Sequence, residues 1–186
     1  IALDEDSLYS SSNLTKYDIV LNSSLQHLTL DFIMNNFNID RNNLEIISIV
    51  RNPYDRIVSD LFFLGLVNIN FSQEQVTKAI KDYLNNDYDG HKRPQYLYLV
   101  DGNNKLYSDV KILRTESLND GMKNLGYHDF DLQANVNAHK VNYMDYLNDE
   151  SITIINNYYD MDFELFNYTK APTSSSKSTE CRNIII

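Results

Sequence analysis

Cysteine and metal-binding patterns are almost absent from this chain. Cys181 is the single cysteine among 186 residues, so an internal disulfide is excluded. No two of the 4 histidines have the i, i+4 spacing of a metal-binding helix, and no Cys/His cluster has the spacing of a zinc site. We therefore expect no metal site, and no reactive or metal-binding role for Cys181.

Long apolar runs and an excess of basic residues are absent as well. No apolar run approaches the ~20 residues that a membrane-spanning helix needs. The chain has 16 basic and 26 acidic residues, a net charge of -10 and a pI near 4.7. This balance argues against a nucleic-acid partner, which would need a broad basic face. A mean hydropathy of -0.43 predicts a soluble globular domain without a membrane segment, and it leaves the compartment open.

Glycine is scarce, with 5 residues in the chain, and the first thirty residues contain none. A Gly-rich phosphate loop cannot be built from such a segment, which argues against a kinase with a Walker loop. The Gly-x-Ser-x-Gly elbow of serine hydrolases is missing too.

Residues 47–59, Ile-Ser-Ile-Val-Arg-Asn-Pro-Tyr-Asp-Arg-Ile-Val-Ser, are the most informative segment. A β-branched run ends at Arg51, and Asn52 then provides an N-cap with a proline at the first helical position. Asp55 takes the capping-box position, and Ser59 lies two turns into the predicted helix. This turn would bring Arg51 and the first helical amides to one small surface where an anion can bind, with Ser59 near the same ligand. An ordinary strand–helix junction without a ligand is the alternative.

Alternating strand and helix patterns organise the rest of the chain. They predict an α/β fold in one domain over residues 1–168, followed by a polar, disordered tail over residues 169–186. The strand at 45–50 is nearly all apolar, as in a strand buried on both faces of a parallel sheet. Further strands are expected at 18–21, 96–100 and 105–113, with a turn at 101–104, and helices at 24–37, 53–64, 72–85, 117–125 and within 143–166.

Four blocks in the same order resemble sulfotransferases that use 3′-phosphoadenosine 5′-phosphosulfate (PAPS), and together they cover about residues 25–168. The first block, from Arg51 to Ser59, resembles the 3′-phosphate-binding motif of that family. The second, His91-Lys92-Arg93-Pro94-Gln95, resembles the H-x-R-P-Q segment of carbohydrate-type members. Residues 112–118 and 157–168 resemble their R-x-E-x-L turn and their Y-x-x-D-F-E-L-F-G-Y ending.

The resemblance implies a P-loop-NTPase-like parallel sheet flanked by helices, the sulfotransferase fold, incomplete at its N-terminus. It implies that Arg51 and Ser59 hold the 3′-phosphate, that Lys140 contacts a phosphate from a closing loop, and that Arg93 and Gln95 bind the acceptor. The implied function is transfer of a sulfuryl group from PAPS to a hydroxyl of a glycan or similar acceptor. The product 3′-phosphoadenosine 5′-phosphate (PAP) would be released, and no metal would take part.

Two histidines are candidates for the base that removes the acceptor proton. His27 precedes the nucleotide strand in a sequence that resembles the family's H-x-T/S element, and an imidazole that titrates near neutrality suits this role. His91 lies in the loop that the resemblance places near the acceptor. A capping or surface role for His27 and an orienting role for His91 are the alternatives. The resemblance implies a structural ion pair of Arg114 with Glu116, which makes Glu116 a weaker candidate base.

The chain departs from the family on the N-terminal side of Arg51. No Pro-Lys-Thr/Ser-Gly-Thr/Ser loop, which cradles the 5′-phosphosulfate in the family, precedes this residue. Either the loop lies upstream of a fragment or it has been lost. Two further functions therefore stay open. One is a catalytically inactive module that binds a 3′-phosphorylated nucleotide or a glycan, and the other is a structural or interaction domain that keeps only the fold.

Overall fold

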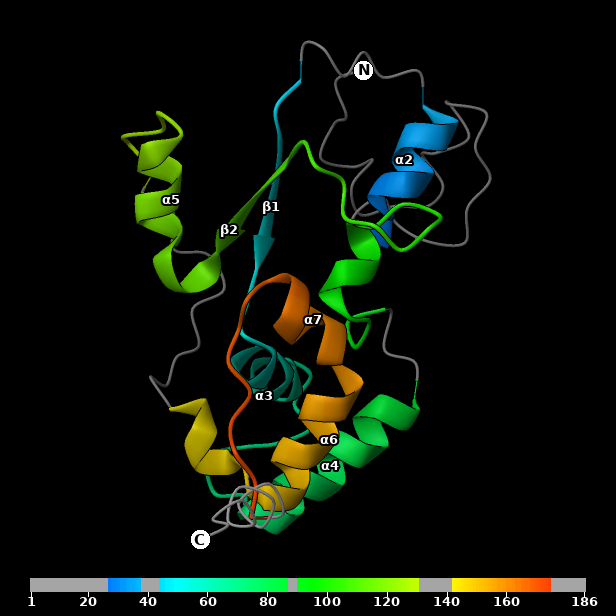
Figure 1. The fold of residues 1–186 in the computed structure, drawn as a ribbon. Helices are drawn as coiled ribbons and strands as arrows, with labels where there is room; N and C mark the ends of the chain where they lie inside the picture. The colour runs from blue at the N-terminus through cyan, green and yellow to red at the C-terminus, as the bar shows by residue number, and fades with distance from the viewer. Residues whose placement is uncertain (1–26, 38–43, 87–89, 131–141, 175–186) are drawn as a thin grey trace, which may run out of the picture. The chain divides into compact units, whose positions relative to one another are not determined.

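The computed structural model describes residues 27–37, 44–86, 90–130 and 142–174 (Figure 1). Within them the chain combines helices with a two-stranded parallel sheet. The packing divides the chain into two compact units: a first unit of residues 1–46 with 95–110, and a second unit of residues 47–94 with 111–186. The predicted α/β class is confirmed, whereas the sulfotransferase fold and the single domain over 1–168 stay predictions.

The sheet pairs β1 (Ile46–Val50) with β2 (Val110–Arg114), and both strands run in the same direction (Figure 1). Val50 is 1% exposed, but Ile49 is 50% exposed. The prediction that this strand is buried on both faces is therefore wrong. β-Branched residues fit a half-buried pleated surface as well as a fully buried one, so an apolar run alone does not show that both faces are covered.

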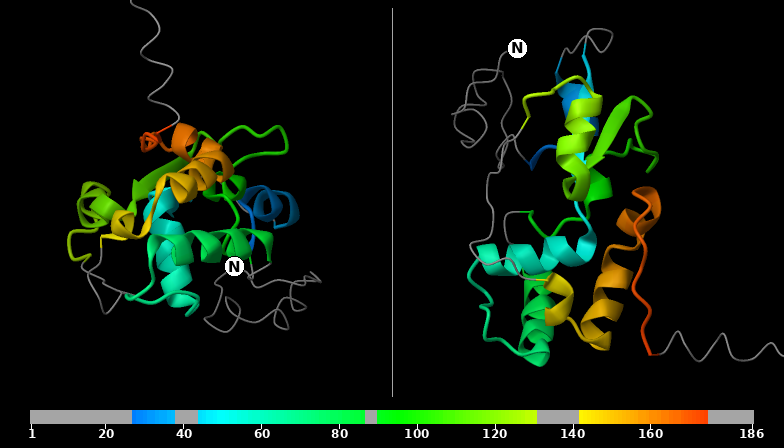
Figure 2. Two further views of the ribbon diagram at one scale, coloured as in Figure 1. Left: turned by 90° about the horizontal axis from the view of Figure 1, so that it is seen from below. Right: turned by 90° about the vertical axis from the view of Figure 1, so that its left-hand side faces the viewer.

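The core of the second unit lies between α3 (Pro53–Phe63), α4 (Gln73–Asn85) and α6 (Asp149–Tyr158). α3 runs crosswise to the other two helices (Figure 2). The helix α7 (Asp160–Leu165) and the 3-10 helix η6 (Tyr143–Tyr146) also contribute to this core. Its fully buried side chains stabilise the fold by about 1.5–3 kcal/mol each, and they include Ile57, Leu61, Ile80 and Ile155.

Capping residues and glycines mark the starts and ends of these helices where the sequence predicts them. Gly65 follows α3 with a φ of 68°, a left-handed conformation that glycine adopts without steric cost. Ser72 and Gln75 form the predicted capping box of α4. α5 (Leu118–Asn124) is followed by Gly126, which also has a positive φ. The helices predicted at 53–64, 72–85 and 117–125, and those within 143–166, are confirmed.

The first unit contains α2 (Leu30–Asn36) and the 3-10 helix η4 (Gln95–Tyr98). α2 begins later than the predicted residue 24, because the side chain of Thr29 caps it by accepting the N–H of Phe32 at 3.1 Å. The Tyr107 hydroxyl donates to the Asp31 carboxylate at 2.9 Å, which ties this short helix to the segment before β2.

The predicted strands at 96–100 and 105–113 do not form a regular hairpin. They share one antiparallel bridge between Val100 and Leu106, and the first of them is largely replaced by η4. The Leu99 N–H donates to the Tyr96 carbonyl, so a local turn uses backbone groups that a ladder would need. The turn itself is confirmed, because the Asp101 carboxylate accepts two backbone N–H groups of the residues that follow it.

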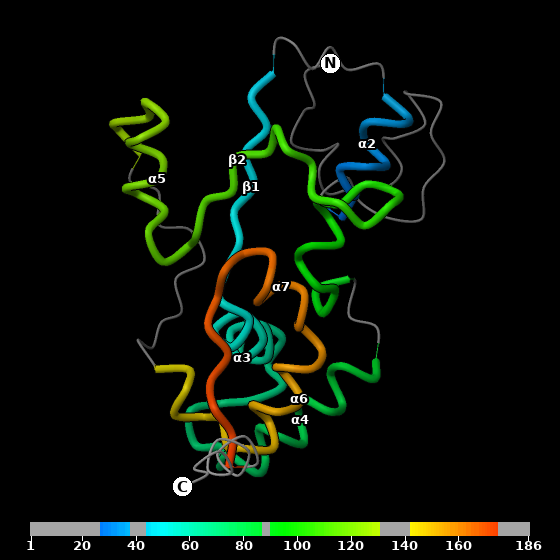
Figure 3. The backbone as a smooth tube through the Cα atoms, in the orientation of Figure 1, coloured from blue at the N-terminus to red at the C-terminus, as the bar shows by residue number. Residues whose placement is uncertain are grey.

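The segment after α7 returns along α3 and α6 (Figure 3). The Ala171 N–H donates to the Tyr54 hydroxyl at 2.7 Å, and the Asn156 side-chain amide donates to the Ala171 carbonyl at 3.2 Å. The Ser174 N–H donates to the Asp149 carboxylate at 3.3 Å, so packing continues through residue 174, although the sequence predicts a disordered tail from residue 169. The predicted strand at 18–21 lies outside the described residues, as does the rest of the tail.

Candidate functional site

The junction predicted around Arg51 is present at the end of β1. The next residue, Asn52, caps α3 because its side-chain oxygen accepts the Tyr54 N–H at 3.0 Å. Pro53 occupies the first turn of the helix, as predicted. A cationic side chain therefore stands directly between a parallel strand and the N-terminus of an 11-residue helix.

Glu116 reaches the same junction from the end of β2. Its Oε1 accepts the Asn52 N–H at 2.7 Å, and its Oε2 accepts the Tyr168 hydroxyl at 2.9 Å. The neighbouring Thr115 hydroxyl donates to the Val50 carbonyl at 3.1 Å. Because the two strands are parallel, the residues that follow them meet at the same edge of the sheet. A carboxylate thus lies at the start of α3.

Arg114 does not form the predicted ion pair with Glu116. Its Nη2 donates to the carbonyls of Phe166 at 2.7 Å and Asn167 at 3.0 Å, and its Cζ lies 4.7 Å from the centroid of the Tyr168 ring. The guanidinium therefore binds carbonyls just after α7, whereas the carboxylate binds an amide at the start of α3. Both contacts follow the preference of cations for carbonyl-rich helix ends and of anions for amide-rich ones.

One arginine and two carboxylates set the charge of the junction. The Arg51 guanidinium carbon lies 5.2 Å from the centroid of the Tyr143 ring, at a distance that allows a cation–π interaction. Burial raises the pKa of Asp55, and the Glu116 carboxylate raises it further, while the Arg51 charge lowers it. Two carboxylates therefore act on the same junction as the Arg51 charge.

Few amides at the start of α3 are left for an anion. The Asn52 N–H is bonded to Glu116, Pro53 has no N–H, and the Tyr54 N–H is bonded to the Asn52 side chain. Among the described residues, only the Asp55 N–H has no partner in this turn. The protein's own side chains therefore satisfy these amides, and an anion would have to displace Glu116 or the Asn52 side chain to bind them.

Ser59 is the other predicted phosphate ligand in this helix. It follows Asp55 by four residues and thus lies on the same face of α3, where its side chain is half-buried. No hydrogen bond joins its hydroxyl to any other described residue. Arg51 therefore lies just before α3, and the Ser59 hydroxyl lies about two turns into the same helix.

A second group of contacts fixes the backbone of the predicted acceptor loop. Arg56 donates from Nη2 to the His91 carbonyl at 2.5 Å and from Nη1 to the Arg93 carbonyl at 2.9 Å. The Tyr159 hydroxyl donates to the Lys92 carbonyl between them at 3.0 Å. The carbonyls of His91, Lys92 and Arg93 are thus bound by Arg56 of α3 and by Tyr159, which lies between α6 and α7.

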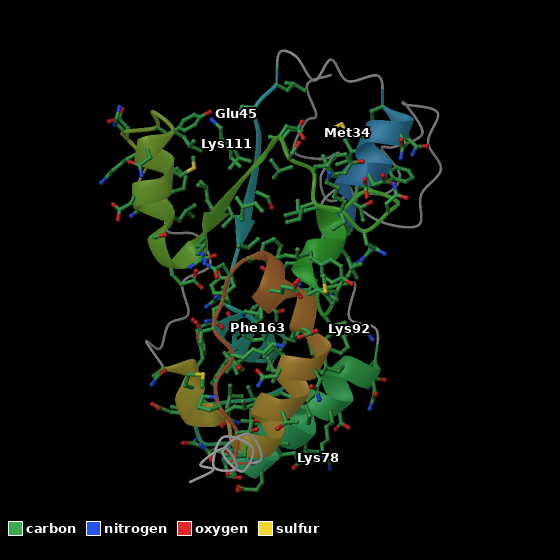
Figure 4. All side chains as sticks on the ribbon, viewed as in Figure 1. Met34, Glu45, Lys78, Lys92, Lys111 and Phe163 are labelled. Carbon is green, nitrogen blue, oxygen red and sulfur yellow. The ribbon has the colours of Figure 1, made fainter. Side chains whose placement is uncertain are left out.

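The side chains of this loop lie half-buried around these anchors. The His91 ring is nearly parallel to the exposed Phe63 ring, with centroids 6.2 Å apart. The Lys92 ammonium donates to the Leu84 carbonyl at 3.1 Å and also to the Asn86 carbonyl at the end of α4 (Figure 4). Lys92 therefore caps a helix rather than serving as a free surface charge.

Asp60 brings a carboxylate to the inner side of the same region. Burial raises its pKa, and the charges of Arg56 and His91 lower it in part. Its Oδ2 accepts the Tyr83 hydroxyl at 3.3 Å. Burial and the Asp60 charge also raise the pKa of Tyr83. The i, i+4 spacing of Arg56 and Asp60 is a sequence signal for this pair that the sequence analysis did not use.

The predicted site residues fall into both units. Arg51, Ser59, His91 and Arg93 belong to the second unit, where Arg56 connects α3 to the backbone of the last two. The half-buried His27 and Gln95 belong to the first unit. Lys140 lies outside the described residues. The structure thus joins α3 to the His91 loop within the second unit.

Comparison of the chain with models of protein families, with curated proteins and with solved structures found no match. Within the described residues, no cluster of histidine, cysteine and acidic side chains could hold a metal ion. In that same part of the chain, no helix has the length and apolar character needed to cross a membrane.

Proposed function

We propose that this chain forms part of a PAPS-dependent sulfotransferase that acts on a hydroxyl of a glycan or similar acceptor. The observation that carries the proposal is the β1–α3 junction, where Arg51 follows a parallel strand and Ser59 lies on the capped helix. A guanidinium and a hydroxyl are suitable donors for one phosphate group. The four sequence blocks described above support the same proposal.

In the proposed reaction the acceptor oxygen forms a bond to sulfur, while the bond from sulfur to the bridging oxygen of the 5′-phosphate of PAPS breaks. PAP leaves, and a base takes the acceptor proton. Arg51 and Ser59 would hold the 3′-phosphate of donor and product, and Lys140 would add a further phosphate contact. His91 or His27 would act as the base, and Arg93 and Gln95 would bind the acceptor.

The backbone contacts of the His91 loop support this assignment of roles. Arg56 lies between the two proposed phosphate ligands in sequence, and it binds the carbonyls of His91 and Arg93. One helix would therefore position both the donor nucleotide and the acceptor loop. Rigid positioning of two reactants is itself a large contribution to catalysis.

Calorimetric titration with PAP and with adenosine 5′-monophosphate (AMP) tests the nucleotide site. We expect PAP to bind more tightly than AMP, because only PAP carries a 3′-phosphate. Arg51→Ala should weaken PAP binding about tenfold or more, since a charge-assisted hydrogen bond is worth about 1.5–3 kcal/mol. Ser59→Ala should have a smaller effect in the same direction.

The control is Lys78→Ala, which removes one positive charge from the exposed face of α4. It should leave the affinity for PAP unchanged, and thermal unfolding should show that each variant is folded. Equal affinity of the wild-type chain for PAP and AMP would contradict the proposal, as would a folded Arg51→Ala variant that binds PAP normally.

A catalytically inactive module that binds a 3′-phosphorylated nucleotide or a glycan is the second candidate. The observation that favours it is that no Pro-Lys-Thr/Ser-Gly-Thr/Ser loop stands before Arg51 in the present sequence. A Lys-Thr/Ser-Gly loop upstream of the present sequence would favour catalysis instead. Binding of PAP without any transfer of sulfate from PAPS to a panel of glycans would favour the inactive module.

A further inference from the structure

Glu116 occupies a position at the β1–α3 junction that a bound phosphate would also favour. Its two carboxylate oxygens accept the Asn52 N–H at 2.7 Å and the Tyr168 hydroxyl at 2.9 Å. The amide is the first donor of the α3 N-terminus, and the partial positive charge of a helix N-terminus attracts anions of any kind. The carboxylate is therefore an internal anion at this end of the helix.

The negative charges of Glu116 and its neighbour Asp55 disfavour the binding of a further anion, such as a phosphate, at the junction. Its charge raises the pKa of Asp55, so the two carboxylates interact through space with Arg51 beside them. The Arg114 guanidinium is engaged with the carbonyls of Phe166 and Asn167. A phosphate dianion held by Arg51 would consequently meet the two carboxylates of Asp55 and Glu116 at the start of α3.

We infer that Glu116 competes with the 3′-phosphate for the start of α3 and thereby limits the affinity of the site for PAP. This inference rests on the proposed function, because it assumes that the 3′-phosphate binds at Arg51 and Ser59. When the phosphate binds, the carboxylate moves away from the Asn52 N–H, and this amide becomes a donor to the phosphate. Glu116 is thus a specificity-determining residue that sets how much negative charge the junction accepts.

The Glu116→Gln variant tests the inference. The glutamine oxygen can still accept the Asn52 N–H, and its amide group can donate to the Tyr168 oxygen, so the local geometry is kept while the charge is lost. We expect PAP to bind about three- to tenfold more tightly, a range that allows for solvent screening of an exposed carboxylate. AMP should bind as before, because it has no 3′-phosphate to compete.

Glu150→Gln is the matched control, since it removes the same charge from the exposed first turn of α6. It corrects for the effect of net charge, and it should leave the ratio of PAP to AMP affinity unchanged. Glu116→Ala provides a second variant in case glutamine perturbs the junction. It removes the competing carboxylate altogether and should also raise the ratio.

The outcomes separate this inference from the proposed function. If wild-type protein prefers PAP and depends on Arg51, but Glu116→Gln leaves the ratio unchanged, the competition is refuted while the nucleotide site stands. A lower ratio in both Glu116 variants also refutes it, because Glu116 would then support the junction in its binding form. If neither the wild-type protein nor any folded variant binds PAP more tightly than AMP, the proposed nucleotide site is refuted, and the inference is refuted with it.

Discussion

Asp60 is a carboxylate whose environment disfavours its charged form. It accepts a hydrogen bond from Tyr83 and lies near the charges of Arg56 and His91, yet burial is the largest influence and raises its pKa. The unfolded chain therefore releases this proton first as the pH rises. Between the pKa of an unfolded aspartate, about 3.9, and the raised value in the folded protein, the folded state binds more protons, so stability falls with rising pH.

Asp60→Asn removes this source of pH dependence. We expect the free energy of unfolding of the variant to fall less steeply than that of the wild type as the pH rises above about 4. Urea denaturation at several pH values measures both slopes. Asp82→Asn, which removes an exposed carboxylate from α4, is the control. Equal slopes for Asp60→Asn and the wild type would show that Asp60 has no raised pKa in the folded protein.

At the scale of elements, helix ends are predictable from sequence because their signals are local. The Asn52 cap, the Ser72 capping box and Gly65 each act within one helical turn, and all three lie where the sequence predicts. The prediction of a strand at 96–100 is wrong, because a local turn uses the backbone groups that a strand would need. Whether a strand face is covered also depends on distant residues, so the exposure of Ile49 could not be predicted.

The candidate site shows the same division between local and distant contacts. Arg51 and its place after a strand follow from the adjacent residues. The contact of Glu116 with Asn52 joins residues that are 64 positions apart, and the bond of Arg56 to the Arg93 carbonyl spans 37 positions. No periodicity or cap encodes such pairs. The residues that set the charge of the junction could therefore not be predicted from the sequence alone.

Arg56 joins α3 to the loop at residues 91–93, so its substitution tests how firmly the helix holds the loop. Arg56→Met keeps much of the apolar stem but loses both hydrogen bonds to loop carbonyls. We expect amide hydrogens in this loop to exchange about tenfold faster, as for a loss of ~1.4 kcal/mol of local stability. Hydrogen–deuterium exchange measured by mass spectrometry reports this change directly.

Lys78→Met is the control for Arg56→Met, because it places the same side chain on an exposed helical surface. Its exchange pattern at 91–93 should match that of the wild type. Unchanged protection in folded Arg56→Met would mean that the Tyr159 hydroxyl, which binds the Lys92 carbonyl, holds the loop without help from Arg56.

At the scale of the molecule, each of the two units has its own contacts, and the second unit contains most of the core. Its stability depends on segments that are distant in sequence. The Tyr54 hydroxyl on α3 donates to the Asn156 side chain on α6 and accepts the Ala171 N–H from the segment after α7. The Tyr54 ring also packs against Phe163, with ring centroids 5.1 Å apart. One side chain thus connects three parts of the chain.

Tyr54→Phe keeps the ring and removes only the hydroxyl. The Ala171 N–H then loses its partner in a partly buried position, which costs about 1–3 kcal/mol. We expect the free energy of unfolding to decrease by this amount in chemical denaturation. Tyr158→Phe, at a tyrosine that is 37% exposed, should change it by less than about 0.5 kcal/mol. Equal effects of the two substitutions would show that the segment after α7 does not stabilise the second unit through Tyr54.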